Sequence, residues 1–112
     1  MKCPTILGLK FDQKSIRGIE KIKRVNELST VLSKFVAIGT FANIFLGNKV
    51  PEITFNIYHF DWHLFHDALN EIPTISKSVI EKEASMQILD HMDDPKQRQF
   101  WEAVLDGCSI PK

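Results

Sequence analysis

The chain has 112 residues, enough for one domain that buries a core without help from metal ions or disulfides. Its hydrophobic content of 44% and charged content of 25% are ordinary for a folded protein and exclude intrinsic disorder. The net charge of zero hides an asymmetry. Residues 1–50 carry nine Lys/Arg against three acids, and residues 51–112 carry five against eleven, so the two halves carry +6 and −6. Such sorting bears on partners rather than on fold.

The two cysteines lie at opposite ends of the chain. No secretory leader is expected at the N-terminus, and the longest apolar run, 35–46, is shorter than the roughly 20 residues that cross a bilayer. We therefore expect a cytoplasmic protein without membrane contact, in which Cys3 and Cys108 stay reduced. The alternative is a bridge between them, which would close a loop of about 105 residues and stabilise the fold by roughly 4–5 kcal/mol.

The first predicted element is a strand over 5–11, where Leu7, Leu9 and Phe11 alternate with other residues. A helix follows, with Asp12 or Ser15 as its N-cap. Its apolar face shifts direction partway along. The helix is therefore predicted either to break near Asn26 or to bend around the core.

Two further strands are predicted in the middle of the chain. Runs 36–46 and 53–60 are rich in β-branched and aromatic residues, and the Gly- and Asn-containing cluster 47–51 between them favours a turn. This pattern predicts a β-hairpin. The same segments also fit helical spacing, so two long helices over 27–46 and 51–72 remain an alternative.

Three helices are predicted beyond residue 60. The first is capped by Asp61 and ends at Pro73, the second opens at Ser76 or Ser78, and the third opens at Asp94-Pro95 and stops at Gly107. In the second helix, the residues expected to face the core are Val79, Ile80, Ile88, Leu89 and Met92. Residues 1–112 are thus predicted to form a single α+β domain of order β-α-β-β-α-α-α, with a three-stranded antiparallel sheet covered by helices. An all-α bundle is the runner-up.

The densest polar cluster contains three of the four histidines. On one helix His59, His63 and His66 would fall within about 60° of arc, a spacing at which two imidazoles reach one metal ion and a third completes a zinc site. The zincin pattern fails because Phe60 stands where the catalytic Glu is needed. If 53–60 is a strand, the histidines separate and serve structure or partner contact. This second interpretation is preferred, and metal binding is kept as an alternative.

Basic residues form a stripe on the first predicted helix, at i, i+3, i+7 and i+10: Lys14, Arg17, Lys21 and Arg24. Such a stripe could neutralise phosphates and bind nucleic acid without regard to sequence. Aromatic residues that would stack on bases do not interleave with it. Nucleic-acid binding by residues 14–24 is therefore an alternative rather than the main prediction.

The C-terminal half combines acidic and aromatic residues. Phosphate-binding glycine loops and a GxSxG elbow are missing from the sequence, so we expect neither an enzyme nor a cofactor. Aromatic anchors beside charges suit a surface that binds a basic protein. The sequence predicts a non-catalytic binding module, such as a small inhibitor, an immunity-type protein or an adaptor, with homodimerisation as a further possibility. The residues predicted to contact the partner are Asp61, Trp62, Phe65, Asp67, Glu71, Asp90, Asp93 and Asp94.

Overall fold

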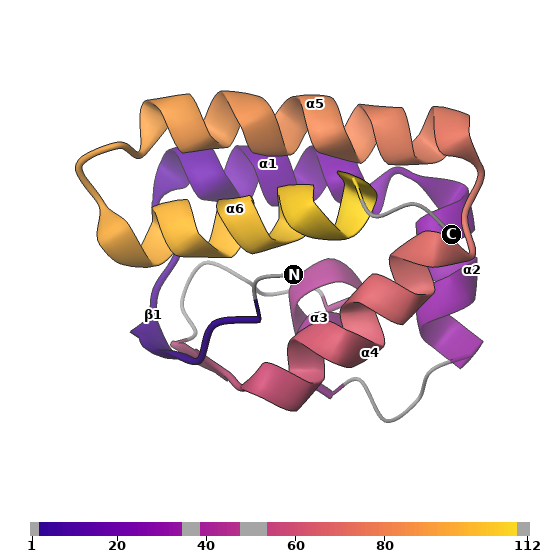
Figure 1. Ribbon diagram of the computed structural model, residues 1–112, viewed down its shortest axis with the longest axis horizontal. Coiled ribbons are helices and arrows are strands. Elements are labelled where there is room, and N and C mark those ends of the chain that lie inside the picture. Colours follow the sequence, from indigo (N-terminus) through magenta and orange to yellow (C-terminus); the bar gives the residue numbers. More distant parts are fainter. Residues whose placement is uncertain (1–2, 35–38, 48–53, 110–112) are drawn as a thin grey trace.

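The computed structural model describes residues 3–34, 39–47 and 54–109. Within these ranges the chain forms six helices and two strands around one hydrophobic core (Figure 1). The fold is therefore mixed α+β but mostly helical. In chain order the elements are β1 (Ile6–Leu9), α1 (Gln13–Lys23), α2 (Asn26–Lys34), α3 (Gly39–Phe45), β2 (Phe55–Ile57), α4 (His59–Asn70), α5 (Thr74–Asp90) and α6 (Pro95–Ser109).

Strands β1 and β2 pair in antiparallel fashion, with Ile6 opposite Ile57 and an irregularity farther along β1. Gly8 lies at that irregularity with a φ of +67°, a conformation that glycine adopts without steric cost, and its N–H donates to Oδ1 of Asn56 at 2.8 Å. Leu7 is 54% exposed. The strand predicted here is confirmed over Ile6–Leu9, but the predicted inward position of Leu7 is wrong because the irregularity interrupts the alternation.

The predicted three-stranded sheet is wrong, because the described part of the run 36–46 forms helix α3. Phe41, Ile44 and Phe45 are buried at i, i+3 and i+4, which is helical spacing. The rings of Phe41 and Phe45 stack on Phe65 of α4, with centroids 4.2 and 5.3 Å apart. Residues 36–38 and most of the predicted turn lie outside the described residues. Of the other predicted strand, only Phe55–Ile57 is a strand.

Local capping signals define the first two helices. Asp12 is the N-cap of α1, where its Oδ1 accepts a hydrogen bond from the N–H of Ser15 at 2.8 Å. Helix α1 ends at Lys23 and α2 begins at Asn26, so of the two predicted alternatives, a break near Asn26 or a bend, the break is the one that forms. Because of that break, the apolar faces of both helices reach the same core.

Helices α4 and α5 both begin earlier than predicted. Helix α4 starts at His59, so Asp61 is not its N-cap but lies in its first turn. There the Asp61 carboxylate is buried and its Oδ2 accepts from the N–H of Tyr58 at 2.9 Å. Helix α5 starts at Thr74, directly after the proline predicted to end the preceding helix.

Helix α6 begins at Pro95, as predicted, but Gly107 does not stop it. Gly107 lies inside α6 at the point where α6 packs against α4. A Cβ at this position would stand 2.5 Å from Cδ2 of His66 and 2.7 Å from Cδ1 of Leu69. The glycine therefore permits a close helix–helix contact rather than ending a helix.

Helices α5 and α6 form a helical hairpin, and α1 packs along α5 (Figure 1). The core between these helices and α3 and α4 is largely aromatic, and its fully buried rings include Trp62, Phe65, Phe100 and Trp101. Cys3 and Cys108 are free thiols, so the alternative of a bridge between the ends is not formed. In the part of the chain that the structure describes, no helix is both long and apolar enough to span a bilayer.

Candidate functional site

A shallow groove runs along the seam between α1 and α5. The two helices are antiparallel, because Asp12 at the start of α1 contacts His91 at the end of α5, and Lys21 near the end of α1 contacts Glu83. Three neighbouring hollows of about 250, 400 and 290 Å³ follow this seam from Asp90 to Ile75. We call this feature the α1–α5 groove.

One side of the groove is the predicted basic stripe. All four of its side chains are exposed on α1 or at its C-cap, and all line the hollows, so the prediction that they share one face is confirmed. We call these four residues the basic ridge: Lys14, Arg17, Lys21 and Arg24. The Nζ of Lys21 lies 3.3 Å from Oε1 of Glu83. The ridge thus faces an open groove with only one of its charges paired to an acid by a described ion pair.

On the other side of the groove, Ile75, Val79 and Met86 line the hollows, and Leu89 continues this exposed apolar row beyond them. Sequence patterning had assigned part of the row to the core. Ile75 is 82% exposed, Val79 49%, Met86 47% and Leu89 75%. With Lys82 among them, these four side chains fall within about 80° of arc on α5 at 100° per residue. We call the four the apolar ridge. The predicted burial of Val79 and Leu89 is therefore wrong, as is that of Met92, which is 55% exposed.

Helix α5 is inverted relative to an ordinary surface helix. Its buried face holds the polar side chains of Ser76, Glu83 and Gln87 beside Ile80 and Ala84, while the four side chains of the apolar ridge face solvent. A surface helix of a monomeric protein normally shows the opposite arrangement. An exposed apolar row of this kind marks an interaction surface.

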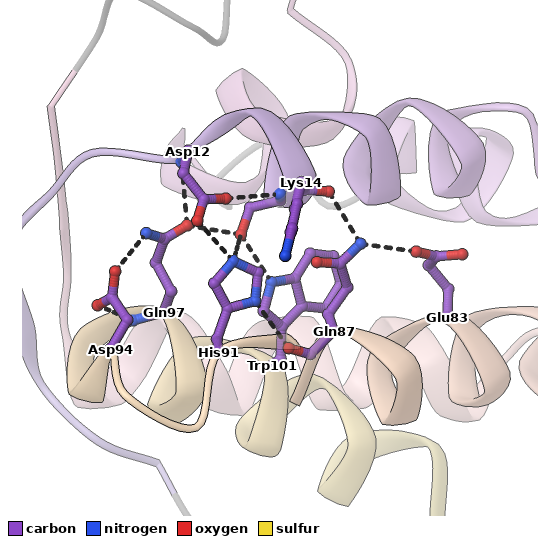
Figure 2. A network of polar contacts seen from close by, with 9 residues as sticks. Asp12, Lys14, Glu83, Gln87, His91, Asp94, Gln97 and Trp101 are labelled. Atoms are coloured by element: carbon purple, nitrogen blue, oxygen red, sulfur yellow. Dashed lines mark hydrogen bonds and ion pairs between the residues drawn. The ribbon is translucent and has the colours of Figure 1, made fainter. Parts of the chain in front are cut away.

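A buried polar network occupies the space beneath the groove (Figure 2). At its centre the hydroxyl of Ser15 donates to Oε1 of Gln97 at 2.6 Å and accepts from Nε1 of Trp101 at 3.0 Å. Nδ1 of His91 donates to the backbone carbonyl of Gln87 at 2.7 Å. These bonds satisfy polar groups in an interior that would otherwise penalise them. On α5 itself, Nε2 of Gln87 donates to the carbonyl of Lys14 and to Oε2 of Glu83, both at 2.8 Å, which helps α5 to bury its polar side.

The network includes Asp12, His91 and Ser15, but its geometry differs from that of a catalytic triad. Nε2 of His91 faces both Oδ2 of Asp12, at 2.7 Å, and the Ser15 hydroxyl, at 3.4 Å, whereas a triad places acid and nucleophile on opposite ring nitrogens. The Ser15 proton is already directed to Gln97, and Ser15 is fully buried. The arrangement therefore serves packing.

The carboxylate of Asp12 is held in its ionised form. Partial burial opposes ionisation, but the hydrogen bond from the Ser15 amide and the contact with His91 outweigh it, so the pKa of Asp12 lies below its usual value. Sequence reasoning recognised Asp12 and Ser15 only as caps. The missed signal is the polar set that recurs on the inner side of α5, at Glu83, Gln87 and His91.

The predicted acidic and aromatic contact surface is not formed. Trp62 and Phe65 are fully buried in the core, so neither is available to anchor a partner. Helical periodicity identified them correctly as one apolar face, and that face packs against α3 and α6. Asp61 is also buried, as a partner of the α4 backbone.

The remaining predicted acids are divided between two ends of the molecule. Asp67 and Glu71 are exposed on and after α4, close to the start of α5. Asp90, Asp93 and Asp94 lie at the far end of α5, about 24 Å away along a helix that rises 1.5 Å per residue. Glu83 and Asp90 moreover line the same hollow as the basic ridge. The two oppositely charged halves of the sequence therefore meet along the α1–α5 seam rather than forming separate poles.

Only two of the three predicted histidine ligands lie together. Nε2 of His59 and Nε2 of His63 lie 3.0 Å apart, and the thiol of Cys3 joins them, with all three ligand atoms within 4.8 Å of one another. His66 lies elsewhere, in the contact between α4 and α6, where its Nε2 donates to the carbonyl of Ala103 at 2.9 Å. Burial lowers the pKa of His66, so this side chain is a neutral core residue.

The chain matches no family model, no curated protein and no solved structure. Three features of its own structure therefore bear on function: the open α1–α5 groove, the closed polar network beneath it, and the cluster of Cys3, His59 and His63. Only the groove and the cluster are open to solvent.

Proposed function

We propose that the protein is a non-catalytic protein-binding module, such as an adaptor, an inhibitor or an immunity-type protein, which holds an acidic amphipathic helix of its partner in the α1–α5 groove. The observation that carries this proposal is the inversion of α5. Ile75, Val79, Met86 and Leu89 are exposed while Glu83 and Gln87 are buried. A partner that covers the apolar ridge removes its side chains from water, which is favourable in proportion to the area buried.

The shape of the surface suits a helix. The apolar ridge extends from residue 75 to residue 89, a distance of about 21 Å at 1.5 Å per residue, or roughly four helical turns. Helices bind in such grooves through apolar residues spaced three and four apart. Met is the most adaptable of the apolar side chains, and Met86 lines two of the three hollows, the middle one and the one that reaches Asp90.

The charge of the groove favours an acidic partner, because five Lys/Arg line its hollows against three acids, Glu27, Glu83 and Asp90. Lys14, Arg17 and Arg24 are exposed beside the apolar ridge, and Lys82 stands among its members. A partner helix with Asp or Glu along one flank would meet these cations while its apolar face met α5. Charges at the rim of an interface direct encounter and select partners more than they add affinity. The partner proposed here is thus opposite in charge to the basic protein predicted from the sequence.

A second copy of the chain is a poorer occupant. If two α5 helices packed antiparallel through their apolar ridges, the two-fold axis would pass close to Lys82, which lies midway between Ile75 and Leu89. The Lys82 ammonium groups of the two copies would then face each other, and like charges in contact are unfavourable. A different chain with a carboxylate at this position relieves the conflict.

Nucleic acid is the competing ligand for the basic ridge. Phosphates would pair with Lys14, Arg17 and Arg24, but they would leave the apolar ridge exposed. A helix with mixed character uses both sides of the groove. The two ligands are distinguished by substitutions in the apolar ridge, which weaken binding of the helix and leave phosphate contacts intact.

The test uses two synthetic helical peptides of about four turns. Both carry Leu on one face; one has Glu along the flanks and the other has Lys. Fluorescence anisotropy should show binding of the acidic peptide, weakened by added salt because exposed charge pairs are screened, and much weaker binding of the basic peptide. A single-stranded oligonucleotide serves as the phosphate ligand.

Two variants form a matched pair for the same titrations. Met86→Lys places a charge in the apolar ridge and should weaken the acidic peptide at least about tenfold. Phe60→Lys replaces an equally exposed apolar side chain on α4, outside the groove, and should leave binding unchanged. Equal binding of both peptides, equal effects of both variants, binding of neither peptide, or binding of the oligonucleotide alone each contradicts the proposal.

A further inference from the structure

Three potential metal ligands meet where the N-terminal segment crosses the start of α4. Cys3 precedes β1, and His59 and His63 occupy the first two turns of α4. His59 and His63 lie on one side of the helix because they are four residues apart. They are exposed and Cys3 is half-buried, so the cluster is open to solvent.

We propose that Cys3, His59 and His63 bind one Zn²⁺ ion. Thiolate and imidazole are the ligands that zinc prefers, and three protein ligands with a fourth position left to solvent is an established coordination pattern. The ligand set differs from the three histidines suggested by helical spacing, because Cys3 takes the place of the buried His66. The site does not share a residue with the α1–α5 groove.

The distances fit this ion. With Zn–N bonds of about 2.0–2.1 Å and a Zn–S bond of about 2.3 Å, tetrahedral coordination places two nitrogens about 3.3 Å apart and a nitrogen and a sulfur about 3.6 Å apart. The Nε2 atoms of His59 and His63 are 3.0 Å apart, and the full set lies within 4.8 Å. The thiol sulfur therefore has to move at most about 1 Å closer to the nitrogens, and rotation of the Cys3 side chain can supply this movement.

The hydrogen bonds already select the correct nitrogen of His59. Its Nδ1 lies 3.0 Å from the backbone carbonyl of Cys3, and because a carbonyl can only accept, Nδ1 carries the hydrogen. In the neutral ring Nε2 then has a lone pair, directed at Nε2 of His63. Such a carbonyl contact is the usual means by which a protein orients a zinc-bound imidazole.

Metal binding replaces hydrogen by zinc at this contact. In the free protein the Nε2–H of His63 donates to the lone pair of His59. When zinc enters, His63 gives its Nε2 proton to solvent and takes one from solvent at Nδ1, so the ring stays neutral. Both Nε2 atoms then bind the ion, and Cys3 releases its thiol proton to solvent. The ion would tie the N-terminal segment to α4 and raise the melting temperature, since a ligand that binds only the folded state stabilises it.

The test uses Zn²⁺ alone, with Cys3→Ala and His63→Gln as site variants and Cys108→Ala as the matched control. Cys108 is the other cysteine of the chain, and it is buried away from the cluster. Titration against a competing chelator should give one Zn²⁺ per chain for the wild type and for Cys108→Ala. Loss of a ligand should weaken binding at least about 100-fold, since even residues that only orient ligands are worth about 10–100-fold.

Spectroscopy identifies the thiolate ligand, and chemical labelling of the wild type provides a readout that does not depend on the fold of a variant. Co²⁺ bound in place of zinc should show a thiolate charge-transfer band that Cys3→Ala removes. Zinc should slow alkylation of Cys3, followed by mass spectrometry, and leave Cys108 unchanged. The proposal fails if the site variants bind zinc as the wild type does, if the wild type binds no more tightly than Cys3→Ala, or if saturating zinc leaves Cys3 equally reactive.

Discussion

Helices α1 and α5 lie side by side but differ in which side chains they bury and which they expose. Helix α1 buries Ile19 and Ile22 and exposes its basic residues, as an ordinary surface helix does. Helix α5 buries Glu83 and Gln87 and exposes Ile75 and Leu89. The polar network makes this inversion tolerable, because Nε2 of Gln87 donates to the carbonyl of Lys14 and to Oε2 of Glu83, although Oε1 of Gln87 is left without a partner.

The contrast shows that the two faces of α5 are not both explained by the stability of the fold. The buried face of α5 holds polar groups whose removal from water costs free energy. Its exposed face holds apolar groups that stay in water and so gain no free energy from folding. Natural sequences depart from consistent patterning mainly at functional sites. The predictions below treat the inner and outer faces of α5 separately, from the largest expected effect to the smallest.

The largest effect is expected where α1 approaches α5 most closely, at Gly18. A Cβ there would stand 2.7 Å from Nε2 of Gln87 and 3.1 Å from Cη2 of Trp101. Gly18→Val should lower the free energy of unfolding by about 3 kcal/mol, because the added methyl groups force the helices apart. Urea unfolding followed by circular dichroism measures this loss, with Arg17→Val on the exposed side of α1 as the control. Similar losses in both variants would show that helix propensity, not close packing, is responsible.

Removal of one hydroxyl from the network should have the next largest effect. Ser15→Ala leaves Nε1 of Trp101 without its partner and removes one of the two donors to Oε1 of Gln97, which keeps the N–H of Asp12. The substitution should cost about 2 kcal/mol of unfolding free energy. Ser78→Ala on α5 is the control, since its exposed hydroxyl donates only to a carbonyl of its own helix. A loss of less than about 0.5 kcal/mol in Ser15→Ala would indicate that the network does not stabilise the inner face.

The network should also make the protein sensitive to acid. Because the pKa of Asp12 in the folded state lies below the ordinary value of 3.8, its carboxylate contributes stability that is fully present above that pH and is lost as the pH falls through the lower folded-state pKa. Asp12→Asn retains an N-cap residue of equal quality but cannot titrate. The difference in unfolding free energy between wild type and Asp12→Asn, measured across pH, should therefore be constant near neutrality and should change in the acid window. A constant difference throughout would contradict the assignment.

The smallest effect on stability is expected on the outer face. Leu89→Ser removes an apolar side chain that is 75% exposed and should change the unfolding free energy by no more than about 0.5 kcal/mol. The same substitution should weaken the acidic helical peptide, so that binding and stability respond to different faces of α5. Ile80→Ser, on the buried face, is the contrasting variant and should be strongly destabilising. A large loss of stability in Leu89→Ser would mean that the apolar ridge belongs to the core.

Features set by a few neighbouring residues could be predicted from the sequence. The N-cap at Asp12, the break at Asn26 and the start of α6 at Pro95 each depend on local backbone chemistry. The basic stripe of α1 was equally predictable, since it follows from helical geometry alone.

Features set by tertiary packing could not be predicted in the same way. Residues 39–45 have the composition of a strand, but they form a helix. The helix buries Phe41, Ile44 and Phe45 on one face and packs the two phenyl rings against α4. Gly107 has the chemistry of a helix stop, yet its use is close contact with His66. The helical spacing of the first segment was visible in the sequence as an alternative, but the choice between strand and helix, like the use of Gly107, depends on the neighbouring helix.

The candidate groove was missed for a related reason. The spacing of Ile75, Val79, Met86 and Leu89 was present in the sequence, but apolar periodicity by itself says which residues share a face and not which way that face points. The direction of α5 is decided by its polar residues, which find partners on α1 and its N-cap. The third zinc ligand was missed because Cys3 comes from a segment 56 residues away from His59.

Both tryptophans, Trp62 and Trp101, have no solvent-exposed surface, and Trp101 donates its indole hydrogen to Ser15. Their emission therefore originates from a dry, rigid environment, at short wavelength and out of reach of dissolved quenchers. It will shift to the red when the chain unfolds. Because neither indole borders the α1–α5 groove or the Cys3 cluster, intrinsic fluorescence gives an optical record of denaturation that is insensitive to occupancy of either surface.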